Sequence, residues 1–179
     1  MARPGRNVTG FTGFEYALGG KWLELLKEIA PRVTRVAVLR DSAIASGPAQ
    51  FAAIQAARRG LELRPVDIRS AGEIERANTA FARSSNGGLI VTGSAAATVH
   101  RKLIIALAAR HQLPAIYYSQ YYVTDGALIS YGPDFLDECQ RAAGYVDCIL
   151  RGEKLVRSAI RPKRCSLNDR KWFVLLQLR

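Results

Sequence analysis

The stretch that decides the fold reads VTRVAVLRD (33–41), SAIASGPAQFAAIQAARRG (42–60) and LELRPVDIR (61–69). The first segment is a β-branched apolar run of the kind that forms buried strands, and the last predicts a second strand. Between them, Pro48 suits the first turn of a helix that runs to the stop at Gly60. Two strands joined by a helix form a βαβ unit, which indicates a parallel sheet covered by helices.

The same alternation of strands and helices continues along the chain. Ser70 with Glu73 makes a capping box that opens the next helix. A leading helix, whose apolar spacing becomes regular after Gly20, is predicted to end at Pro31. Further helices are predicted at 71–85, 97–112 and 134–152, and further strands at 88–94, 113–118 and 127–132. A polar-aromatic loop is predicted at 119–126. Right-handed crossovers then predict an α/β fold, a three-layer doubly wound parallel sheet of five main strands in the order 2-1-3-4-5.

Composition favours a folded domain with a strongly basic C-terminal segment. The chain has 179 residues, 49% of them hydrophobic, which is enough to bury a core. Residues 1–150 carry 17 basic and 13 acidic side chains, whereas residues 151–179 carry 9 basic and 2 acidic ones. The tail therefore holds most of the net charge of +11. Such a tail is typical either of a patch for nucleic acid or an anionic surface, or of a merely solvated or non-native segment.

Candidate ligand-binding residues come from the ends of the predicted strands. In an open parallel sheet, ligands bind beyond the carboxyl ends of the strands, where the strand order reverses. Here that point lies between the first and third strands, and aromatic residues of the fourth and fifth strands add a wall. The predicted ligand-binding residues are Asp41, Ser42, Thr92, Gly93, Ser94, Tyr117, Tyr118 and Tyr131. Two alternatives to a ligand-binding role stay open. In one, Asp41 and Ser42 cap the next helix, and in the other, the tyrosines are half-buried residues at the sheet edge.

No feature of the sequence predicts an enzyme. His100 and His111 are expected on one face of one helix, without a matching carboxylate or cysteine. The sequence lacks G-x-G-x-x-G, P-loop and G-x-S-x-G motifs, and it has no CxxC or Cys/His cluster. We therefore predict no catalytic residue, no cofactor and no metal site.

Several stretches together resemble one protein family. They are ARPGRNVTGFTGFEYALGGKWLELLKEIAPRVTRVAVLRD (2–41), ELRPVDIRSAGEIERA (62–77), GGLIVTGSAAATVHR (87–101), LIIALAARHQLPAIY (103–117), GALISYGPD (126–134) and RAAGYVDCILRGEK (141–154). These are similar to the substrate-binding proteins of ABC transporters, which are type I periplasmic binding proteins, and within them to the tryptophan/tyrosine-type branch. The likeness runs from Ala2 to Lys154, and the residues after Lys154 depart from the family pattern.

The resemblance implies a domain map and a function. The family traps a small ligand between two Rossmann-like lobes. By this map, residues 1–30 form the crossing between lobes and a leading helix, and residues 31–132 form the second lobe. Residues 133–153 form a helix that packs on the first lobe, and residues 154–179 form a basic tail unlike the family. The first lobe is expected to precede Met1, and the tail to be a frameshift product.

The implied activity is the binding of a small amino-acid-like or related organic solute for an ABC permease and ATPase. The uncovered inter-lobe face predicts a homo-oligomer, with nucleic acid an unlikely partner. The family is periplasmic, whereas residues 1–6 lack the apolar region of a signal peptide, so the chain as written is expected in the cytoplasm, without a membrane span. The alternative is an intracellular regulatory or nucleic-acid-associated module that uses the same lobe and the basic tail.

Overall fold

The computed structural model describes residues 18–152 and the short strand at 175–176. The described residues fall into two compact units. One holds residues 18–132 with 175–176, and the other holds residues 133–152.

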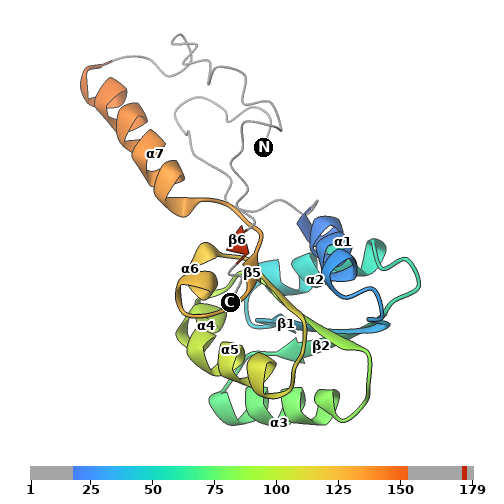
Figure 1. Ribbon diagram of the computed structural model, residues 1–179. Helices are drawn as coiled ribbons and strands as arrows, with labels where there is room; N and C mark the ends of the chain where they lie inside the picture. The colour runs from blue at the N-terminus through green and yellow to red at the C-terminus, as the bar shows by residue number, and fades with distance from the viewer. Residues whose placement is uncertain (1–17, 153–174, 177–179) are drawn as a thin grey trace. The chain divides into compact units, whose positions relative to one another are not determined.

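A single sheet forms the centre of the larger unit (Figure 1). Its strands are β1 (Arg35–Arg40), β2 (Glu62–Asp67), β3 (Gly87–Val91), β4 (Ala115–Tyr117), β5 (Ile129–Ser130) and β6 (Leu175–Leu176). They lie in the order β2-β1-β3-β4-β5-β6, and the first five run parallel. The predicted order 2-1-3-4-5 is therefore confirmed. The sixth strand, which pairs antiparallel with β5, lies in the tail and was not predicted.

Helices cover both faces of this sheet, which makes the three predicted layers (Figure 1). The helices of the larger unit are α1 (Leu18–Ile29), α2 (Ser46–Ala56), α3 (Ala71–Ala82), α4 (Ala95–Val99), α5 (Arg101–Arg110) and α6 (Gln120–Thr124). Helices α1 and α2 contact each other on one face, and α3 contacts α5 on the other.

The core lies between these layers and explains why the apolar runs became strands. Every residue of β3 is buried, as are the four central residues of β1. Helix α1 contributes Trp22 and Leu26, which are at most 1% exposed. Burial of such large side chains stabilises the fold by about 1.5–3 kcal/mol each, before the cost of ordering the chain.

Two helix predictions were wrong in detail. The helix expected over 97–112 is two helices, because the chain turns at His100 between α4 and α5. His100 and His111 flank α5 as its N-cap and C-cap residues, and His111 Nε2 lies 3.3 Å from the Thr79 hydroxyl. The segment 119–126, expected as a loop, contains α6, whose first turn is capped by the Ser119 hydroxyl.

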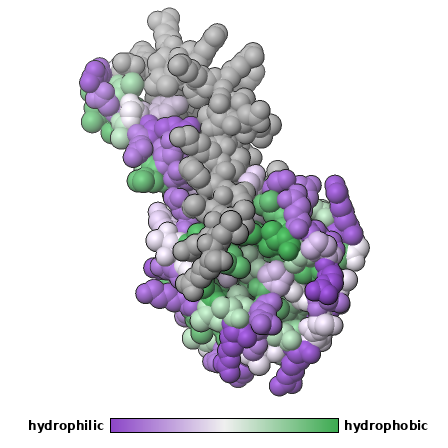
Figure 2. Space-filling view, viewed as in Figure 1, coloured by the Kyte–Doolittle hydropathy of each residue, from purple (hydrophilic) through white to green (hydrophobic). Residues whose placement is uncertain are grey.

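The smaller unit consists of helix α7 (Phe135–Leu150) and its cap. The Asp134 carboxylate accepts hydrogen bonds from the backbone N–H groups of Leu136 and Asp137, which satisfies donors that every helix start leaves open. None of its residues is buried, and Val146 and Leu150 are 52% and 81% exposed. Hydrophilic and hydrophobic residues mix on its visible surface (Figure 2). Within the described residues, no helix has the length and apolar character that crossing a membrane requires.

Candidate ligand-binding face

The register of the sheet brings the ends of four strands into one row. Leu39 pairs with Val91, Val91 with Tyr117, and Tyr117 with Ser130. The next residue of each strand therefore lies at the carboxyl edge of the sheet. Those residues are Arg40, Thr92, Tyr118 and Tyr131. The connection that leaves β1 runs through α2 to β2 on one side, and the connection that leaves β3 runs through α4 and α5 to β4 on the other, so the strand order reverses between β1 and β3.

The loop after β1 presents Asp41 and Ser42, both half-buried. The Asp41 carboxylate accepts a hydrogen bond of 3.0 Å from the backbone N–H of Ala43, which fixes a local turn. Neither residue caps the following helix, because the N-cap of α2 is Ala45 and no side chain bonds there. The capping alternative for these two residues was therefore wrong.

A close backbone contact holds this loop against α2. A Cβ built on Gly47 would lie 1.8 Å from the carbonyl oxygen of Asp41, so only glycine fits. The helix can thus begin directly beside the strand end. Gly47 shares the buried face of α2 with Gln50 and Ile54.

The loop after β3 is tied to β1 by Thr92. This residue is fully buried, and both its backbone N–H and its hydroxyl donate to the Leu39 carbonyl, at 3.0 and 2.8 Å. Gly93 and Ser94 follow and are half-buried. The Ser94 hydroxyl accepts a hydrogen bond from the Ala97 N–H, so it caps α4. Of the three predicted residues here, Thr92 and Ser94 make structural hydrogen bonds, and Gly93 and Ser94 keep accessible surface.

The three predicted tyrosines lie in different surroundings. Tyr118 is 8% exposed, and its hydroxyl lies 2.6 Å from the Thr98 hydroxyl of α4. Tyr117 is 2% exposed and stacks on Tyr122, with ring centroids 4.8 Å apart. Tyr118 also contacts Tyr122, edge to face, with ring centroids 5.6 Å apart, so the Tyr122 ring packs against both. Tyr117 lines a cavity at the amino ends of the strands, away from the predicted site.

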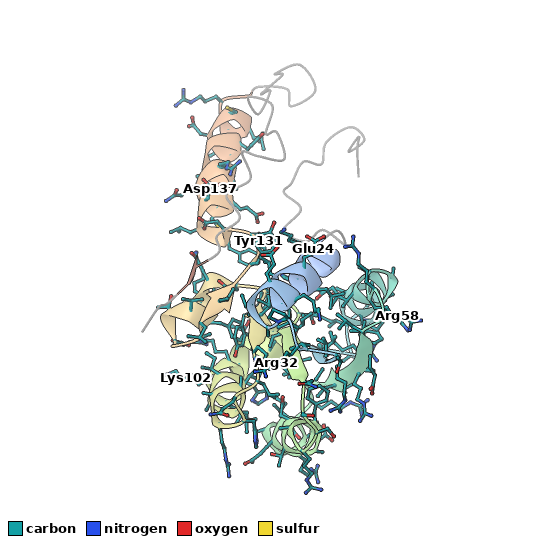
Figure 3. The ribbon with its side chains drawn as sticks, turned by 45° about the vertical axis from the view of Figure 1, so that its right-hand side comes forward. Glu24, Arg32, Arg58, Lys102, Tyr131 and Asp137 are labelled. Atoms are coloured by element: carbon teal, nitrogen blue, oxygen red, sulfur yellow. The ribbon has the colours of Figure 1, made fainter. Side chains whose placement is uncertain are left out.

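Tyr131 is the tyrosine that stays partly exposed at the carboxyl edge. Its carbonyl accepts a hydrogen bond of 2.7 Å from Trp22 Nε1 of α1, and its N–H donates to the Tyr117 carbonyl. Figure 3 shows it next to Glu24 of α1. Burial raises the pKa of its hydroxyl, Lys21 lowers it, and Glu24 raises it again. Its hydroxyl therefore stays protonated at neutral pH and can donate a hydrogen bond.

Gln50 is a residue of this edge that the sequence analysis missed. Its side chain is 2% exposed, and its Nε2 donates to the Gly93 carbonyl at 3.4 Å. Its Oε1 has no hydrogen-bond partner in the part of the chain that the structure describes. Buried acceptors almost always find a donor, so one from elsewhere is expected there. The spacing of Gly47, Gln50 and Ile54 on one helix face was the signal that could have found it.

Arg40 supplies the positive charge closest along the chain to Asp41. Its Nε lies 3.4 Å from the Asp67 carboxylate at the end of β2, and its guanidinium stacks over the Phe51 ring at 5.0 Å. These contacts direct the charge toward the β2 side of the edge. The described residues contain no group of three or more His, Cys, Asp or Glu side chains able to hold a metal ion.

The arrangement offers polar and aromatic groups suited to binding. Asp41, Ser42, Gly93 and Ser94 keep accessible surface at the switch point, where they supply carboxylate, hydroxyl and backbone groups. Tyr131 adds a phenol at the same edge, two strands away at the end of β5. Thr92, Tyr117 and Tyr118 are buried and offer little surface to a ligand. Such a mixture can hold a small polar ligand with an apolar part.

Comparison with known proteins agrees with this fold. A sequence model of the family described as ABC transporter substrate binding protein matches residues 1–166. No curated protein matches the chain.

Solved structures show the same architecture at low sequence identity. A conserved domain protein from Vibrio cholerae O1 biovar El Tor is 24% identical, with a TM-score of 0.72 over 84% of this chain and 50% of that one. The ABC domain in complex with L-Trp from Streptococcus pneumonia is 19% identical, with a TM-score of 0.66 over 76% and 48%. The open, ligand-free substrate-binding protein CD0873 from Clostridium difficile, which has adhesive properties, is 23% identical, with a TM-score of 0.64 over 85% and 51%. The chain thus spans about half the length of each of these structures.

Proposed function

The chain belongs to the family of ABC transporter substrate-binding proteins, and from this premise we propose that it binds a small amino-acid-like or related organic solute at the carboxyl edge of its sheet. The observation that carries the proposal is the row of strand ends at the switch point. Asp41, Ser42 and Ser94 lie there, Tyr131 follows β5 at the same edge of the sheet, and open α/β sheets bind ligands at this edge.

The residue types favour a ligand with both charge and an apolar part. A carboxylate such as Asp41 suits a ligand ammonium group, whereas hydroxyls and backbone N–H groups suit a carboxylate. The phenol of Tyr131 offers an aromatic surface and a hydrogen-bond donor. A structural relative was solved with L-Trp bound, which makes L-tryptophan a reasonable first ligand to test.

One lobe contacts only one side of a ligand. Type I binding proteins enclose their ligand between two lobes, and residues 18–132 form one sheet unit. Binding by this chain alone is therefore expected to be weak, with a Kd of about 1 mM or above. A second lobe from another chain or copy would supply the remaining contacts.

The expected partners follow from the family. In a complete uptake system, an ABC permease and ATPase receive the solute, and the family works in the periplasm. We further propose that copies of the chain associate through the inter-lobe face and through α7. The exposed apolar residues of α7 support this, because large exposed apolar surfaces on a protein mark contacts with partners.

Calorimetry with a panel of amino acids and simple sugars tests the proposed function. An amino acid should bind in the millimolar range, and Asp41→Ala should weaken it several-fold because the carboxylate partner is lost. Glu75→Ala, which removes an exposed carboxylate from α3, is the matched control and should leave binding unchanged. Equal binding by both variants, or no binding by any amino acid, would contradict the proposal.

A further inference from the structure

A second hollow lies at the opposite edge of the sheet. This amino-edge cavity, of about 640 Å³, is bordered by the end of α1, the end of α5, the first residues of β4 and the turn at 126–128. Its volume is within the range of small-molecule sites in proteins. It lies away from the carboxyl edge and belongs to no part of the proposed solute site.

Large apolar side chains form the mouth and walls of the amino-edge cavity. Ile29 and Leu128 are 43% and 62% exposed, and both line it. Ile105 and Leu113 add apolar surface from the α5 side. Exposed aliphatic groups gathered around a hollow favour the binding of an apolar body there.

A tyrosine side chain lies in the wall of this cavity. Tyr117 lines it and is 2% exposed, with its ring stacked on Tyr122. Within the described residues, the Tyr117 hydroxyl makes no hydrogen bond. Burial raises the pKa of this hydroxyl, so the group is a neutral donor at physiological pH. A neutral phenol without a partner can donate a hydrogen bond to a group that enters the cavity.

Positive charge lies at the mouth. Arg32, labelled in Figure 3, lies in the turn between α1 and β1, is exposed, and forms no ion pair with any residue the structure describes. Lys27 Nζ donates to the carbonyls of Pro31 and Val33, which line the cavity. Glu28 in the same helical turn offsets one of these two charges, so the mouth keeps a net positive charge.

We propose that the amino-edge cavity binds a small aromatic carboxylic acid that carries a polar group on its ring. The ring lies between Ile29, Leu128 and Ile105, and its polar group accepts a hydrogen bond from Tyr117. The carboxylate remains at the mouth beside Arg32, where an anion needs little desolvation. This makes a second ligand site, separate in place and chemistry from the carboxyl edge.

Three probes that differ by one group each test this site. They are 3-(4-hydroxyphenyl)propionate, 3-phenylpropionate without the ring hydroxyl, and 3-(4-hydroxyphenyl)propan-1-ol without the charge. Titration is followed by NMR on the methyl groups of Ile29, Ile105 and Leu128 in the full chain. The first probe should bind about fivefold more tightly than the second, as one hydrogen bond is worth, and two- to fivefold more tightly than the third at low salt.

Variants assign each preference to its residue. Tyr117→Phe should abolish the preference for the ring hydroxyl and keep the preference for the charge, and Arg32→Gln should do the reverse. Tyr121→Phe and Arg83→Gln, both at exposed positions outside the cavity, are the matched controls and should change neither. Because Arg32 is exposed, its variant carries the test even where Tyr117→Phe alters the fold.

Three results would overturn the proposal. The first is a preference for the ring hydroxyl that persists in Tyr117→Phe. The second is probe-induced shifts at Asp41 and Ser94 with none at Ile29 or Leu128. The third is a more than fivefold gain in affinity for all probes on deletion of residues 177–179, since the chain's own end would then be the occupant.

Discussion

Gly47→Ala should destabilise the fold strongly, although it adds only one methyl group to a helix. The added Cβ would lie 1.8 Å from the Asp41 carbonyl oxygen and 2.7 Å from its carbonyl carbon. Real contacts of this type are above 3 Å, so α2 and the loop at 41–45 must separate by more than 1 Å. Both partners are backbone atoms, and neither can turn away as a flexible side chain would.

The magnitude follows from two opposing effects. Alanine lowers the free energy of a helix by up to about 1 kcal/mol relative to glycine. Overpacking a tight contact costs about 1–3 kcal/mol, and more where backbone must move. Because Gly47 is buried and Thr92 holds the neighbouring strand end in place, we expect a net loss of about 2–3 kcal/mol in the free energy of unfolding.

Urea unfolding monitored by circular dichroism measures this change. Gly72→Ala is the matched control, because Gly72 also lies in the first turn of a helix but a Cβ there meets nothing within 4 Å. That variant should be neutral or slightly stabilised. If Gly47→Ala is as stable as Gly72→Ala, the close contact that positions the Asp41 loop does not exist and the reasoning fails.

Three further predictions concern the sheet, its tyrosines and α7. Thr92→Val should lower the free energy of unfolding by about 1 kcal/mol, because it removes the buried hydrogen bond from the Thr92 hydroxyl to the Leu39 carbonyl. Urea unfolding measures this change, and a loss below about 0.3 kcal/mol would contradict that bond. Burial raises the pKa of Tyr117, so the folded state holds this proton more tightly than the unfolded chain does. The contribution of this group to the free energy of unfolding should be fully present below about pH 10 and should fall above it by up to about 1.4 kcal/mol per pH unit. Tyr117→Phe should flatten that slope in unfolding curves between pH 8 and 11. An unchanged slope would count against the buried phenol. The chain should sediment as an oligomer at tens of micromolar, and Val146→Glu should shift it toward monomer; a monomeric unaltered chain would refute self-association.

The sheet could be predicted because its signals are strong and local. The apolar runs at 33–41 and 88–94 became β1 and β3, each with a buried interior. The capping pair Ser70 and Glu73 marked the start of α3, and the Ser70 hydroxyl does accept from the Glu73 N–H. Helices of the right length between the strands then left few possible topologies.

The errors came from short elements and from the tail. Helix α6 has five residues, too few for a periodic pattern, so only the cap at Ser119 could have indicated it. The turn at His100 joins two segments whose composition is continuous, which hid the division between α4 and α5. Strand β6 has two residues and pairs with β5 across a long separation in sequence, which no local pattern reports.

The sequence predicted the location of the candidate site better than the orientation of its side chains. Strand order locates the switch point, and this placed Asp41, Ser42 and Ser94 together. The face of the sheet that each tyrosine side chain takes depends on the exact strand end, because a shift of one residue exchanges the two faces. Tyr117 therefore lines the opposite cavity while its neighbour Tyr118 lies beside α4.

The central claim is that the carboxyl edge of this sheet is the solute-binding face. The most direct measurement is NMR shift mapping of the backbone amides while L-tryptophan is titrated to its solubility limit. The account predicts progressive shifts at Asp41, Ser42, Gly93 and Ser94, with a Kd of about 1 mM or above. Shifts confined to the amino-edge cavity around Ile29 and Leu128, or none at the four edge residues, would contradict it.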